Sequence, residues 1–118
     1  MRIAFIGCGG IARAHADGLC KRSDVEFAGA FDADPQRAQS FAGQYGGTAY
    51  SGVAEMLDGA RPDAAWVCLP PFAHGEAELA LAARRIPFLV EKPIALTLET
   101  AQRILEATER TGTLAGAA

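Results

Sequence analysis

A chain of 118 residues, 50% of them hydrophobic and 21% charged, is long enough for one folded domain and too short for two domains of ordinary size. This composition excludes a disordered chain, and a net charge of −3 with scattered basic residues argues against a nucleic-acid-binding protein. The three cysteines form no CxxC pair and have no histidine at metal-ligand spacing. We therefore expect reduced, buried thiols and no metal site.

Targeting and membrane segments are not evident. The first residues, MRIAFIG, leave no room for a signal peptide. No stretch reaches the roughly 20 apolar residues that span a bilayer. We expect a cytoplasmic protein that has no membrane partner.

In chain order, short apolar runs alternate with helical patterns. The runs 2–6, 25–31, 64–69 and 87–90 lack polar alternation, which is typical of strands covered on both faces. The first helix follows the glycine-rich loop after residue 6. Asp34 with Pro35 predicts the start of the second, and Ser51 is a candidate cap for a short third helix.

Two further helices follow in the second half of the chain. The alanine-rich stretch HGEAELALAARR is apolar on most faces and predicts a helix packed against a sheet. Thr97 predicts the start of a longer helix that ends at Gly112. The tail TGTLAGAA is either a sixth strand or a frayed end.

This alternation predicts an α/β fold in a single domain over residues 1–118. We expect a doubly wound parallel sheet of five or six strands, in the order 3-2-1-4-5-6, with helices on both faces.

The stretch IGCGGIARAH carries the most specific local motif. Gly7, Gly9 and Ala12 fit G-x-G-x-x-[GA] between the first strand and the first helix. In this context Gly7 allows a tight turn, Gly9 lets a pyrophosphate approach the main chain, and the helix N-terminus attracts the phosphates. The alternative is a strand-to-helix turn whose glycines serve the backbone alone.

Asp32 supports a dinucleotide ligand. It ends the second strand 20 residues after Ala12, where a carboxylate can accept hydrogen bonds from an adenosine ribose. The alternative is that Asp32 or Asp34 only caps the next helix, but Asp34 already stands in the capping position. A carboxylate here would repel a 2′-phosphate, so we expect NAD to be preferred over NADP.

Four ordered motifs together resemble the amino-terminal domain of the glucose-fructose oxidoreductase and inositol dehydrogenase family, whose NAD(P)-binding domain is a Rossmann fold. They are IGCGGIARAH, AFDADPQRA, LPPFAHGE and VEKPIALT. The resemblance covers nearly the whole chain, and the Glu-Lys-Pro after the run 87–90 is its most specific part.

The resemblance implies a role for each matching residue. It places Gly7, Gly9, Gly10 and Ile11 along the pyrophosphate, and Asp32 and Arg37 at the adenosine. It places Leu69, Pro70 and His74 beside the nicotinamide ribose, and Glu91 at that ribose or at the carboxamide. Lys92 would be the catalytic residue and would face the substrate hydroxyl.

Each of these later roles has a plainer alternative. Glu91 and Lys92 could be an exposed charge pair worth less than about 1 kcal/mol. His74 could simply begin a helix, and His15 is expected to be a packed or surface residue within the first helix. Cys8 is expected to be only a small side chain that fits the loop.

Family enzymes continue into a second domain that supplies most of the sugar site, and no substrate domain is present in these residues. We therefore expect an NAD(P)-binding domain of an oxidoreductase acting on sugars or polyols, incomplete as a catalyst alone. One alternative is a non-catalytic NAD(H)-sensing or interaction module that pairs with a separate chain supplying a substrate domain. Another is a fragment that binds no ligand.

Overall fold

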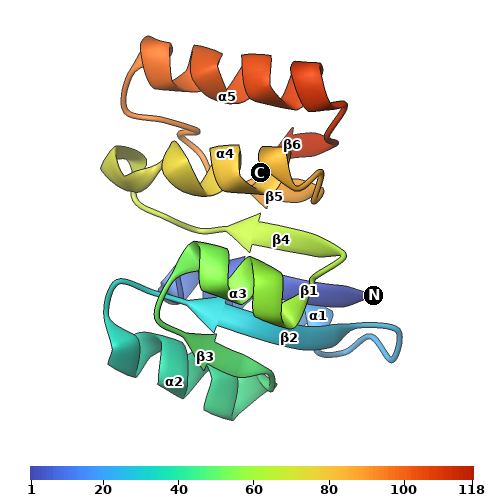
Figure 1. The fold of residues 1–118 in the computed structure, drawn as a ribbon. Helices are drawn as coiled ribbons and strands as arrows, with labels where there is room; N and C mark the ends of the chain where they lie inside the picture. Colours follow the sequence, from blue (N-terminus) through green and yellow to red (C-terminus); the bar gives the residue numbers. More distant parts are fainter.

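The computed structural model describes residues 1–118 and arranges them as a parallel sheet with helices on both faces (Figure 1). The strands are β1 (Arg2–Ile6), β2 (Glu26–Phe31), β3 (Thr48–Tyr50), β4 (Ala64–Val67), β5 (Phe88–Val90) and β6 (Ala115–Ala117). The helices are α1 (Gly10–Leu19), α2 (Pro35–Tyr45), α3 (Val53–Ala60), the short 3-10 helix η1 (Pro71–Ala73), α4 (Glu76–Ala83) and α5 (Leu98–Thr111). The strand order β3-β2-β1-β4-β5-β6 confirms the predicted doubly wound sheet.

The strands at the two edges of the sheet were the hardest to locate from sequence. β3 has only three residues, Thr48–Tyr50, and lacks the apolar run that marks the buried strands. The tail forms β6, which pairs in parallel with β5, so it is a strand and not a frayed end. Edge strands gain less burial than central ones, so their hydrophobic pattern is weaker.

Capping residues set the helix ends largely as predicted. Asp34 accepts a hydrogen bond from the backbone N–H of Gln36 at 3.0 Å, and Thr97 caps α5 by accepting from the N–H of Thr100 at 3.2 Å. Gly112 ends α5 with a left-handed φ of 70°. Each such cap stabilises its helix by about 1 kcal/mol.

The prediction for Ser51 was wrong. The N-cap of α3 is Gly52, which has no side chain to accept from the first turn. The Ser51 hydroxyl instead donates to the Glu55 carboxylate at 2.7 Å. The serine lies one residue too early, so its oxygen bonds a side chain of the first turn and not a backbone N–H.

The sheet separates two hydrophobic clusters. On one face, α1 and α2 cover an aromatic group in which the rings of Phe5 and Phe41 lie 4.9 Å apart. On the other face, α3, α4 and α5 pack over β1, β4 and β5 through Met56, Leu81 and Ile104. Burial of each large apolar side chain contributes about 1.5–3 kcal/mol, and these two clusters hold the carboxyl ends of the strands in register.

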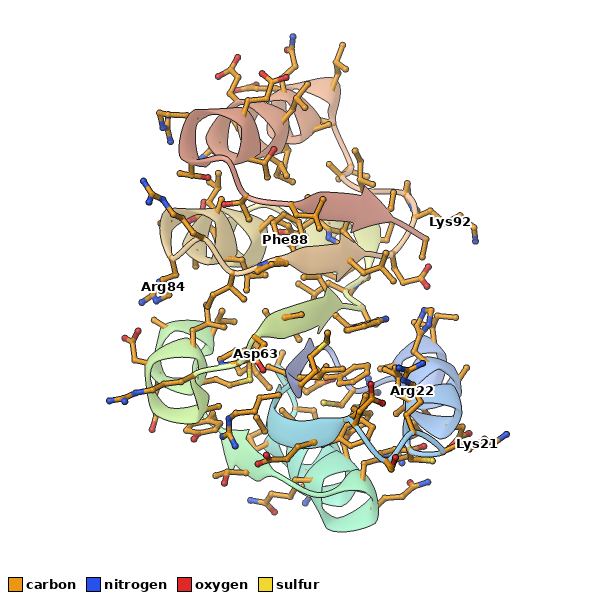
Figure 2. The ribbon with its side chains drawn as sticks, turned by 90° about the vertical axis from the view of Figure 1, so that its right-hand side faces the viewer. Lys21, Arg22, Asp63, Arg84, Phe88 and Lys92 are labelled. Carbon is orange, nitrogen blue, oxygen red and sulfur yellow. The ribbon has the colours of Figure 1, made fainter.

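Helix coverage is uneven on the α1 face of the sheet. Figure 2 shows α1 beside β1 and β2, whereas no helix lies against β4, β5 and β6 on that side. A hollow of about 350 Å³ on the β4–β6 half is lined by nine residues, seven of them hydrophobic, including Trp66 and Leu89. The half of the sheet that carries α1 is therefore covered by helices on both faces, and the other half is covered on one face.

Candidate functional site

The predicted site residues lie at one edge of the sheet. All strands run parallel, so their carboxyl ends meet on the left of Figure 1. The loops after β1, β2, β4 and β5 leave the sheet at this edge and carry the four sequence motifs. Open α/β sheets bind ligands at this edge, beside the point where the strand order reverses, which here is between β1 and β4.

Gly7 is required by the fold itself. Its φ is +89°, and an added Cβ would lie 2.3 Å from the carbonyl oxygen of Cys68. That oxygen belongs to the main chain, so it cannot move away without distorting the backbone. The Gly7 N–H donates to the carbonyl of Phe31 at 2.8 Å. Gly7 therefore lets the loop leave β1 between the ends of β2 and β4.

Gly9 and Gly10 are open toward solvent. Gly9 is the N-cap of α1 with an extended φ of −78°, which any residue can adopt, and a Cβ at either glycine would meet nothing within 4 Å. The fold therefore gives no packing reason for glycine here, and Ile11 beside them is exposed. The space is suited to a group that approaches the first-turn N–H groups of α1, and these favour an anion.

Ala12 shows the packing that the motif predicts. Its side chain is fully buried between α1 and the sheet, together with Ala16 one turn later. A small residue at this place lets the helix axis lie close to β1. The N-terminus of α1 is thereby held over the end of the strand.

The Asp32 carboxylate is held rigidly by the backbone. Its Oδ2 accepts from the N–H of Cys8 in the glycine loop at 2.8 Å, and its Oδ1 accepts from the N–H of Asp34 at 2.9 Å. Asp34 supplies the helix cap, as predicted, but Asp32 is not a free side chain. A carboxylate has about four acceptor positions, so two bonds position Asp32 and leave capacity for the hydroxyls of a ligand.

A hollow of about 350 Å³ lies between the glycine loop and the segment after β4. Its lining combines glycine-loop backbone, polar groups after β2 and apolar groups after β4: Gly7, Gly9, Asp32, Ala33, Arg37, Cys68, Leu69, Pro70, Phe72 and Ala73. Leu69 and Pro70 thus share one hollow with Asp32 and Arg37, although the resemblance assigns the two pairs to different parts of the cofactor. Phe72, which sequence reasoning missed, is 75% exposed at its rim.

His74 lies beneath this wall and not on its surface. Its side chain is fully buried, with Nδ1 bonded to the Glu78 carboxylate and Nε2 2.9 Å from the carbonyl oxygen of Leu69. The second oxygen of Glu78 accepts from the N–H of Gly75 at 2.7 Å. Any contribution of His74 to a ligand site is therefore through the main chain of Leu69, which it holds in place.

Glu91 and Lys92 follow β5, and their side chains point in different directions, Glu91 toward α1 and Lys92 into solvent. The Glu91 side chain is 12% exposed, and its Oε1 lies 2.6 Å from Nε2 of His15 in α1. This hydrogen bond is the largest cause that lowers the pKa of Glu91, so the carboxylate stays ionised. Lys92 is exposed and projects away from the ribbon (Figure 2). The pair is therefore not a simple surface ion pair.

Burial raises the pKa of two of the three thiols. Burial, with a smaller effect of the Asp32 carboxylate, raises the pKa of Cys8 to about 12, and burial with Glu91 nearby does the same for Cys68. Cys20 is exposed, so the expectation of three buried thiols was wrong for this residue. It follows the last turn of α1, where its side chain has no strand to pack against.

Clusters of metal-ligating side chains and membrane-spanning helices are both absent. No group of three or more His, Cys, Asp or Glu side chains gathers where it could hold a metal ion. None of the helices combines the length and the apolar character needed to cross a bilayer.

Comparison with known proteins agrees with the geometry. The profile of an oxidoreductase family with an NAD-binding Rossmann fold matches residues 1–117. The chain belongs to this family. It is 37% identical over 109 residues to glucose-6-phosphate 3-dehydrogenase of Bacillus subtilis, covering 92% of this chain and 31% of that protein. It is 35% identical over 114 residues to inositol 2-dehydrogenase of Arthrobacter sp., covering 95% of this chain and 34% of that protein.

Solved structures show the same fold. The crystal structure of the WlbA dehydrogenase from Bordetella pertussis, in complex with NADH and UDP-GlcNAcA, superposes with a TM-score of 0.92 at 23% identity. The superposition covers 99% of this chain and 36% of the WlbA chain. The chain thus spans about a third of the length of the relatives that it matches. The predicted family, fold and NAD cofactor are confirmed, and the roles of individual residues remain predictions.

Proposed function

We propose that these 118 residues form the NAD(H)-binding part of a dehydrogenase that oxidises a hydroxyl group of a sugar or cyclic polyol. The observation that carries the proposal is the open space at Gly9 and Gly10, directly over the N-terminus of α1. Membership of an NAD-binding oxidoreductase family supports it. So do the glucose-6-phosphate and inositol dehydrogenases among its relatives.

In this proposal the adenosine half of the cofactor occupies the hollow beside Asp32. Asp32 accepts hydrogen bonds from the ribose hydroxyls, Arg37 lines the same hollow, and Leu69 and Pro70 form its apolar wall. The pyrophosphate lies on the N–H groups that follow Gly9. Gly7 serves the fold and the turn, so its role is to shape the loop that the phosphates contact.

The other half of the cofactor extends across β1 toward the ends of β4 and β5, where Glu91 and Lys92 lie. When bound, NAD supplies the acceptor for the hydride of the substrate carbon. Lys92 takes the proton of the substrate hydroxyl at Nζ. Glu91 lies beside the nicotinamide ribose or the carboxamide and orients it.

The groups that hold the substrate are proposed to lie outside these residues, in further sequence or in another chain. Lys92 is exposed and no wall faces it. Orientation of the reacting atoms contributes roughly 7 to 11 kcal/mol of a barrier, whereas acid–base help is worth about 10²–10⁴-fold. Lys92 and bound NAD alone would therefore give little turnover.

The test is to incubate the purified 118-residue protein with NAD and a panel of inositols, sugars and linear polyols while following NADH absorbance. We expect NADH to bind in a fluorescence titration and no NADH production above the blank. Failure to bind NADH would contradict the proposed function. NADH production that Lys92→Ala abolishes would show that these residues contain a complete active site.

A further inference from the structure

His15, which has no role in the proposed site so far, contacts Glu91. It lies in the second turn of α1, six residues after the N-cap Gly9, and its Nε2 is 2.6 Å from Oε1 of Glu91. The two residues are 76 positions apart in the sequence and come from elements on opposite sides of the β1–β4 switch point. This bond joins the helix that faces the phosphates to the loop that carries Lys92.

The Glu91 carboxylate depends on His15 for its position. Its other partner is the N–H of the adjacent Lys92, at a long 3.2 Å from Oε2. That bond joins neighbours along the chain and does little to restrict the side-chain torsions of a glutamate. His15 is therefore the partner from another element that fixes where the carboxylate points.

The place of Glu91 relative to the cofactor follows from the strand order. Asp32 ends β2 and the glycine loop follows β1, so a dinucleotide with its adenosine at Asp32 must continue toward β4 and β5. Glu91 directly follows β5, whereas the adenosine hollow includes neither Glu91 nor His15. The His15–Glu91 pair is therefore beside the nicotinamide half and apart from the adenosine half.

We propose that His15 is a positioning residue that fixes the Glu91 carboxylate for the nicotinamide half of the cofactor. The inference rests on the proposed function, because it requires the cofactor to lie across this edge. Its consequence is that one helix orients both halves. The N-terminus of α1 holds the pyrophosphate, and its second turn, through His15 and Glu91, holds the group that meets the nicotinamide end.

A truncated ligand separates this role from a general structural role. ADP carries the adenosine and the pyrophosphate but lacks both the second ribose and the nicotinamide ring. Calorimetric titrations with NADH and with ADP are made on the parent, on His15→Leu and on His15→Gln, which retains an N–H donor. Ala14→Leu is the matched control, because it adds the same side chain at the exposed neighbouring position of α1.

We expect His15→Leu to weaken NADH binding about threefold to tenfold, the range of one hydrogen bond, and to leave ADP binding within about twofold. His15→Gln should recover part of the loss, and Ala14→Leu should change neither affinity. If His15→Leu does not fold, His15→Ala, which favours the helix, is titrated with the same two ligands. The same selective loss of NADH affinity would support the role.

Two outcomes would overturn the positioning role alone. In the first, the parent binds both ligands and the His15 variants lose affinity for both by the same factor. In the second, the variants bind NADH as tightly as the parent does. A change in the stability of α1 would lower the affinity for both ligands, so it would not produce a loss of affinity for NADH alone. If the parent binds neither ligand, the proposed function fails together with this inference.

Discussion

The loops after β1 and β2 differ from the loop after β5 in how their polar groups are held. After β2, Asp32 accepts two hydrogen bonds from backbone N–H groups, one of them in the glycine loop. After β5, Glu91 is held by a side chain of α1, and Lys92 is exposed. The first region also has a hollow of about 350 Å³, in whose lining neither Glu91 nor Lys92 takes part.

This difference separates two ways of building a site. Backbone donors are placed by the fold itself, so the Asp32 region is rigid as soon as β1 and β2 pair. The β5 region depends on one contact between distant side chains and leaves its catalytic candidate, Lys92, exposed. We infer that the adenosine half of the site is preorganised, whereas the nicotinamide half is completed by ligand and by further protein groups.

The largest effect is expected where the backbone of the first region is tightest. Gly7→Ala would put a Cβ 2.3 Å from the Cys68 carbonyl at a φ of +89°. Left-handed strain and overpacking together should lower the free energy of unfolding by about 2–5 kcal/mol, as measured by urea denaturation. Gly9→Ala is the control and should change it by no more than about 1 kcal/mol, because its Cβ meets no atom and only the preference for glycine at an N-cap is lost. Equal stability of both variants would show that the loop is not rigid.

A smaller effect is expected on the choice of cofactor. The Asp32 charge should repel a 2′-phosphate by of order 4 kcal/mol at a separation of about 4 Å before screening. Nearby Arg37 reduces that repulsion by contacting the same site. Asp32→Ala should therefore narrow the NAD-to-NADP affinity ratio by about tenfold or more. Asp58→Ala, which removes a carboxylate paired with Arg84 outside this hollow, should leave the ratio unchanged, and an unchanged ratio in both variants would assign Asp32 to the backbone alone.

The smallest effect concerns the thiols. The raised pKa values of Cys8 and Cys68, about 12 each, keep both protonated at pH 8, and both are buried. Iodoacetamide should modify exposed Cys20 in the native protein and reach the other two only after denaturation, as read by mass spectrometry of peptides. Rapid modification of Cys8 in the native protein would mean that the glycine loop opens readily.

Sequence reasoning predicted the parts of the molecule that local chemistry determines. Gly7 allows the turn after β1 because glycine readily adopts its left-handed φ. Asp34 and Pro35 mark the start of α2 because a capping carboxylate and a first-turn proline occur together. The buried strands were located by continuous apolar runs. These signals lie within a few residues of each other, so the sequence carries them directly.

The contacts between distant elements could not be predicted in the same way. His15 was interpreted as a packed or surface residue, because nothing near it in the sequence shows that Glu91 lies against α1. His74 looked like a ligand-facing residue, yet Glu78 one turn later and the Leu69 carbonyl draw its ring inward. β3 was not located because an edge strand of three residues has too few positions for a pattern.

The central claim is that the open space over the N-terminus of α1 receives the cofactor phosphates, and titration of NADH into Gly9→Val tests it most directly. Gly52→Val is a matched control, because Gly52 is also an N-cap with extended backbone and no atom within 4 Å of an added Cβ. We predict that Gly9→Val loses NADH binding while its melting temperature stays within a few degrees of the parent, and that Gly52→Val binds as the parent does. NADH binding to Gly9→Val at parental affinity would contradict the account.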